Sequence, residues 1–172
     1  GKLLALGNPA TPFAALPAAA DAAKTIGADF KQSDVFTGDK AVKSLLTGDK
    51  AAKASVIHIA SHGLFYPDKP MLSALALSGG AGDNYDGLLQ VHEIFGLKLS
   101  AANLVTLSAC ETGLASISDG DELVGLSRAF IYAGAPRVIV SLWSVNDAST
   151  VELMKNLYAD KSGGAAAALR QA

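Results

Sequence analysis

The stretches V-I-H-I-A-S-H-G (Val56 to Gly63) and L-V-T-L-S-A-C-E-T-G (Leu104 to Gly113) decide the fold of this chain. Each begins with an apolar run of strand length. Neither run shows the polar alternation of a half-exposed strand, which favours a parallel sheet covered on both faces. The first run leads to His62 and the second to Cys110, the only cysteine in the chain. We expect these two residues just past the carboxyl ends of two neighbouring strands.

Strand and helix patterns alternate through the rest of the chain. The alternation predicts an α/β fold, a three-layer sandwich with a mostly parallel central sheet and helices on both faces. The first strand closes in the turn Gly7-Asn8-Pro9. Two short apolar segments around the Gly-rich stretch 78–86 predict a small hairpin inserted after the histidine strand. Together with the strands already described, the whole pattern predicts strands at 2–6, 30–36, 54–60, 103–108 and 137–141. It predicts helices at 16–26, 91–97, 123–133 and 148–159.

Length and composition limit the classes of protein that the chain can represent. Its 172 residues suit one domain, and a net charge of −2 gives no basic excess for nucleic acid. No apolar run reaches the roughly 18 residues of a membrane-spanning helix. A single cysteine cannot form an internal disulfide and favours a reducing, cytoplasmic location. Because the chain starts at Gly1 and stops inside a helical pattern at Ala172, we expect residues 1–172 to be a domain from a longer, multidomain protein.

The cysteine and the histidine suit a nucleophile with its base. A free thiol is only a few per cent ionised at neutral pH, so an adjacent imidazole that takes its proton activates it. Peptide hydrolysis also needs N–H donors for the oxyanion, and the backbone amides of Gly63 and Cys110 are the candidates. The alternative is structural: Cys110 is then a small buried apolar residue and His62 a core histidine with a hydrogen-bond partner.

The other two histidines do not suggest a metal site. His58 falls inside its strand, where we expect it buried with a hydrogen-bond partner, and His92 falls in a short exposed helix. His58 and His62 have the spacing of a zinc pair but run from the interior of a strand to its end. We therefore expect neither a metal nor another cofactor.

At these residues the chain resembles the CHAT-domain family, a branch of the caspase-like cysteine peptidases that also includes separases and gingipains. H-I-A-S-H-G resembles the histidine motif of the family, and L-V-T-L-S-A-C-E-T-G resembles its cysteine motif. The following segments G-L-S-R-A-F-I-Y-A-G-A-P-R-V-I-V-S-L-W-S-V-N-D (Gly125 to Asp147) and V-E-L-M-K-N-L-Y also match. The resemblance covers the chain from about Val56 to Ala172, and less clearly from Lys2.

The resemblance implies a cysteine endopeptidase in which His62 is the general base and Cys110 the nucleophile, acting on a protein or peptide substrate. It also implies that tetratricopeptide repeats accompany the domain in the full-length, usually bacterial, protein. Family members usually continue into a Trp-containing strand after the last helix, whereas this chain stops at Ala172.

Four residues are weaker candidates for substrate binding. Trp143 follows a strand and either walls the pocket or packs over the sheet edge. Asp147 either lines the pocket or caps the helix that starts at Ala148. Asp119 and Asp121 lie in an acidic loop, which could receive Lys or Arg or could simply be a solvated loop.

Two other functions stay open. The chain could be a catalytically silent or latent peptidase-like domain that binds partner proteins as an effector or scaffold. It could also be a flavodoxin-like binder of nucleotide or phosphate. The absence of a Gly-rich phosphate loop after the first strand counts against the second of these.

Overall fold

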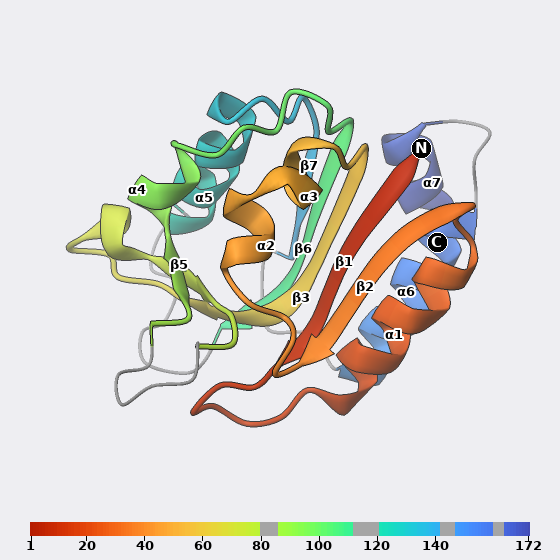
Figure 1. Ribbon diagram of the computed structural model, residues 1–172, viewed down its shortest axis with the longest axis horizontal. Helices are drawn as coiled ribbons and strands as arrows, with labels where there is room; N and C mark the ends of the chain where they lie inside the picture. Colours follow the sequence, from red (N-terminus) through yellow and green to blue (C-terminus); the bar gives the residue numbers. More distant parts are fainter. Residues whose placement is uncertain (80–85, 112–120, 142–146, 160–163) are drawn as a thin grey trace.

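The computed structural model describes residues 1–79, 86–111, 121–141, 147–159 and 164–172, of which 109–111, 121–124 and 147–148 are described by their backbone. The strands of these residues form a seven-stranded sheet in which parallel pairing runs β2-β1-β3-β6-β7 (Figure 1). The strands are β1 (Lys2–Pro9), β2 (Gln32–Gly38), β3 (Val56–Leu64), β4 (Ala74–Ala76), β5 (Leu88–Gln90), β6 (Leu104–Glu111) and β7 (Val138–Val140).

Helices cover both faces of this sheet, as the alternating pattern predicted. On one face lie α1, α6 and α7, and on the other α2 to α5 (Figure 1). The bounds are α1 (Pro17–Ala28), α2 (Ser44–Thr47), α3 (Asp49–Ala52), α4 (Val91–Ile94), α5 (Asp121–Tyr132), α6 (Asp147–Ala159) and α7 (Ala165–Gln171), with a 3₁₀ turn η1 at Pro70–Leu72.

The layers are held by two hydrophobic cores, one on each face. Because successive residues of a strand face opposite sides, the apolar runs supply both cores at once. Leu3 and Ala5 of β1 pack with α1, α6 and α7, whereas Leu4 and Leu6 pack with the core on the α2–α5 face. All four are fully buried. A strand apolar on both faces is therefore what a covered parallel sheet requires.

The hairpin predicted after the histidine strand is confirmed. Strand β4 pairs antiparallel with the end of β3, and β5 pairs antiparallel with β4. The hairpin supplies His62, Gly63 and Leu64 with ladder partners on the side of β3 opposite β6. This pairing extends β3 to Leu64. The α/β class, the three layers and the hairpin thus all agree with the sequence analysis.

Candidate active site

Strands β3 and β6 are direct neighbours, and their register pairs His62 with Cys110. Adjacent strands of a sheet lie about 4.8 Å apart, and register partners in a parallel pair occupy the same face. The expectation that both residues stand just past the strand ends is wrong. They lie within the last three residues of their strands, because β3 ends at Leu64 and β6 at Glu111. One backbone ladder therefore brings together the two residues that the sequence selected.

The imidazole of His62 is held by a backbone carbonyl. Its Nε2 lies 2.6 Å from the carbonyl oxygen of Ala14, in the segment between β1 and α1. A carbonyl oxygen can only accept, so Nε2 carries the proton and, in the neutral ring, Nδ1 is the unprotonated nitrogen. The phenyl ring of Phe13 meets the imidazole edge-on at 5.7 Å between centroids. Only 8% of His62 is exposed.

The second ring nitrogen of His62 is available for chemistry. Nδ1 is buried and has no hydrogen-bond partner among the described residues. A buried nitrogen lone pair without a donor is costly unless something uses it. A neutral imidazole fixed through Nε2, with a cysteine at the neighbouring register position, is the arrangement needed to take a thiol proton.

Ala14 and Phe13 were not among the residues that the sequence indicated. A carbonyl group is present in every residue and gives no sequence signal. The stretch 10–16 also carries no motif that predicts which carbonyl faces the histidine. Only the crossing of this segment over the end of β3, a tertiary feature, assigns Ala14 this role.

The remaining predicted site residues divide into two groups. Gly63 lies in β3 as the register partner of both Leu75 and Glu111. The register alone does not test the oxyanion-hole role of the Gly63 amide, which stays a prediction. Asp121 and Asp147 are the first residues of α5 and α6, which therefore start two residues and one residue earlier than expected, and Asp121 does not lie in a loop. Asp119 and Trp143 lie outside the described residues.

His58 belongs to a buried polar cluster in the interior of the sheet, as its position in the strand predicted. It is fully buried, its Nδ1 lies 3.3 Å from the hydroxyl of Tyr158, and that hydroxyl donates to Thr106 Oγ1 at 2.8 Å. Thr106 is the register partner of His58. Burial lowers the pKa of His58 to about 4 and raises that of Tyr158 above its ordinary value of 10. Both groups are therefore neutral at pH 7, and the cluster ties α6 to the strands that carry the two site residues.

The lowered pKa of His58 predicts acid sensitivity of the fold. Between its unfolded value of 6.5 and about 4, the unfolded chain binds a proton that the folded chain excludes. The free energy of unfolding therefore falls as the pH falls through this window, by about 2 kcal/mol from pH 7 to pH 5. Urea unfolding at both pH values measures this drop. In the matched variant His58→Gln, which cannot titrate, the drop should be smaller by the same amount, and an unchanged drop would contradict the assignment.

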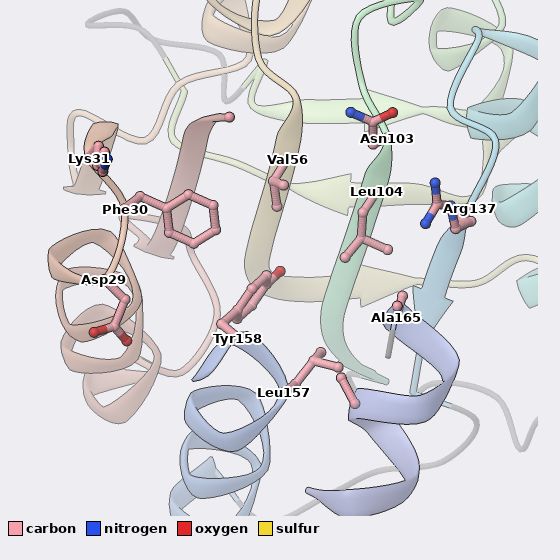
Figure 2. A pocket seen from close by; sticks show the side chains of 13 residues that line it. Asp29, Phe30, Lys31, Val56, Asn103, Leu104, Arg137, Leu157, Tyr158 and Ala165 are labelled. Carbon is pink, nitrogen blue, oxygen red and sulfur yellow. The ribbon is translucent and has the colours of Figure 1, made fainter. Parts of the chain in front are cut away.

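A cavity of about 450 Å³ opens at the amino ends of the strands, opposite to the strand ends that carry His62 and Cys110 (Figure 2). Its floor includes Val56 and Leu104, the first residues of β3 and β6. The aromatic rings of Phe30 and Tyr158 form part of its wall. Six residues of extended strand, or about 20 Å, separate Val56 from His62. The cavity is therefore distinct from the edge that carries the two site residues.

Neither a metal cluster nor a membrane span is found in the described parts of the chain. Their His, Cys, Asp and Glu residues form no group of three that could hold an ion. Of the helices in these parts, none is both long and apolar enough to cross a bilayer.

Comparison with known proteins first defines the class of fold. Among solved structures, the chain is similar to a flavodoxin of Streptococcus pneumonia TIGR4, with a TM-score of 0.51 and 15% identity over 94% of this chain and 98% of that one. At this identity the likeness shows the α/β fold alone. No curated protein matches the chain.

The family follows from the sequence as a whole. The family model of the CHAT domain matches residues 1–172, so this chain belongs to the CHAT-domain family, a family of caspase-like peptidases. The resemblance that the histidine and cysteine motifs carried is thereby confirmed over the full chain, including the part before Val56 where it was less clear.

Proposed function

We propose that this chain is a cysteine endopeptidase in which Cys110 is the nucleophile and His62 the general base. The observation that supports the proposal most directly is the register of β3 and β6, which pairs His62 with Cys110. The Ala14 carbonyl accepts the Nε2 proton of His62, and Nδ1 has no hydrogen-bond partner among the described residues. Membership of the CHAT-domain family supports the same assignment.

The proposed reaction runs through an acyl-enzyme. His62 Nδ1 takes the proton of the Cys110 thiol, and the thiolate adds to the scissile carbonyl carbon, whose oxygen becomes an oxyanion. The sequence pattern puts forward the N–H groups of Gly63 and Cys110 as donors to that oxyanion. The imidazolium then gives its proton to the leaving amine as the C–N bond breaks. Water, deprotonated by the same imidazole, finally hydrolyses the thioester and restores the thiol.

The carbonyl of Ala14 has a definite part in this scheme. When His62 becomes positively charged, the hydrogen bond from Nε2 to Ala14 becomes charge-assisted and therefore stronger. The imidazolium is thus stabilised at the moment it forms. The same bond fixes the ring through Nε2 and so limits its rotation.

Cleavage of a peptide mixture tests the proposal. Peptides derived from a whole proteome are incubated with the chain under reducing conditions, since the thiol must stay unoxidised, and new ends are identified by mass spectrometry. We expect cleavages that disappear in Cys110→Ala. The residues before the cleaved bonds also test whether Asp119 and Asp121 receive Lys or Arg, as we propose from the acidic loop of the sequence. Cleavage that persists in Cys110→Ala assigns the activity to a contaminant.

One observation favours a second function, that of a latent or silent domain that binds partner proteins. His62 is only 8% exposed, and Phe13 lies against its ring. A substrate must displace part of this cover to reach Nδ1. If no peptide is cleaved and partner proteins bind Cys110→Ala as tightly as the wild-type chain, the binding function replaces the peptidase. Accompanying tetratricopeptide repeats and a cytoplasmic location remain part of the proposal.

A further inference from the structure

The turn at the end of β1 contains a residue in an unusual conformation. Asn8 has φ of 47°, in the left-handed region where asparagine and glycine are favoured over other residues. The register with β2 shifts here, because Gly7 pairs with Thr37 and Pro9 pairs with Gly38. Asn8 is therefore an extra residue in the ladder, and β1 includes the three residues at which the sequence predicted a turn.

The side chain of Asn8 closes the segment that follows it. Its Oδ1 accepts the N–H of Leu16 at 2.7 Å. Leu16 is the residue before α1, and α1 packs close to this end of β1: a Cβ added to Gly7 would lie 2.5 Å from the carbonyl oxygen of Ala19. Asn8 thus ties the end of segment 10–16 to its beginning.

The beginning of the segment is held as well. The N–H of Ala10 lies 2.8 Å from Ser78 Oγ and 3.2 Å from the carbonyl oxygen of Gly38, and the Ser78 hydroxyl donates to the same carbonyl at 2.6 Å. With both ends fixed, the middle of the segment has little freedom. Phe13 and Ala14 lie in that middle, against His62.

We propose that Asn8 is a positioning residue for the peptidase site: by accepting the Leu16 N–H, it fixes the segment whose Ala14 carbonyl holds the His62 imidazole. The catalytic meaning of this role rests on the proposed function, whereas the positioning itself does not. The hydrogen bond that Asn8 makes is to the Leu16 N–H and not to His62. It acts through the backbone of residues 10–16.

Two substitutions separate the hydrogen bond from the backbone conformation. Glycine adopts positive φ freely but has no acceptor, so Asn8→Gly removes the bond and keeps the turn. Aspartate tolerates the same region and retains an acceptor oxygen, so Asn8→Asp should restore the bond. Thermal unfolding of both variants confirms that they fold.

Nitrogen-edited proton NMR reads out the positioning without any substrate. The Nε2 proton of His62 should exchange slowly with water in the wild-type chain, because it is buried and hydrogen-bonded. Loss of one hydrogen bond shifts such an opening equilibrium by up to about tenfold. We therefore expect this proton to exchange about tenfold faster in Asn8→Gly and at the wild-type rate in Asn8→Asp. His58, which is buried elsewhere in the sheet, is the internal control and should be unaffected.

The outcomes separate the two proposals. A His62 Nε2 proton with the same exchange rate in Asn8→Gly as in the wild-type chain overturns the role of Asn8, whatever the activity. In the wild-type chain itself, a Leu16 N–H that exchanges as in an unfolded peptide also overturns it. If the NMR result is as expected but no variant cleaves peptides, the positioning stands and the peptidase proposal fails. If peptides are cleaved, Asn8→Gly should lower kcat by up to about tenfold without changing KM, because the proposed role of Asn8 is to position the base and not to bind substrate.

Discussion

Replacing both Cys110 and His62 is expected to cost no more activity than replacing either one. Cys110→Ala removes the nucleophile, and His62→Gln removes the base while its amide can still donate to Ala14. Each should lower kcat by on the order of 10⁴-fold or more, as single replacements do in another hydrolase whose nucleophile and base act as a unit. The double variant should lie at the same residual rate. Steady-state cleavage of a peptide found by the library experiment measures all four rates.

The comparison of the single and double variants tests whether His62 and Cys110 act as one unit, which neither single variant can do alone. If the two losses multiply, His62 and Cys110 contribute independently, and the dyad is wrong even though both residues matter. Cys110→Ser supplies a matched control of nearly the same shape. Its slower reaction should still require His62, since a hydroxyl needs a base more than a thiol does.

The largest effect on stability is expected at Phe130. This side chain of α5 is fully buried in the core on the α2–α5 face. Phe130→Ala removes most of a ring from a close-packed interior and should lower the free energy of unfolding by about 3–5 kcal/mol. The loss also matters for the site, because α5 follows β6 in the chain and packs against β7, the strand that pairs with β6.

The neighbouring residue gives the control for this prediction. Ile131 lies on the same helix but is 53% exposed, so Ile131→Ala should change the free energy of unfolding by no more than about 0.5 kcal/mol. Urea unfolding at pH 7 compares the two variants. A cost below about 1 kcal/mol for Phe130→Ala would mean that α5 does not pack as described.

The sequence predicted those parts of the site that depend on side-chain chemistry and local pattern. Two largely apolar runs without polar alternation implied neighbouring buried strands, and the residues near their ends, His62 and Cys110, became register partners. It did not predict how far the strands extend. That depends on the pairing of His62–Leu64 with Ala74–Ala76, a contact between segments whose short length gives little pattern.

The support of the imidazole could not be predicted for a different reason. The acceptor is a main-chain oxygen, and its placement depends on how residues 10–16 cross from β1 to α1. The turn signal at Gly7-Asn8-Pro9 was visible in the sequence, but its consequence was not. A left-handed asparagine in a strand and a hydrogen bond to Leu16 are properties of the folded segment.

The ladder between β3 and β6 also limits how such a domain can be regulated. Because the backbone spacing of two central strands sets the distance between the backbones at His62 and Cys110, an effector cannot separate the pair without breaking the sheet. Switching must then act on access to the pair or on the ring of His62. The segment 10–16 touches that ring without belonging to the sheet, so inhibitors or activators of this domain should be sought among molecules that move it.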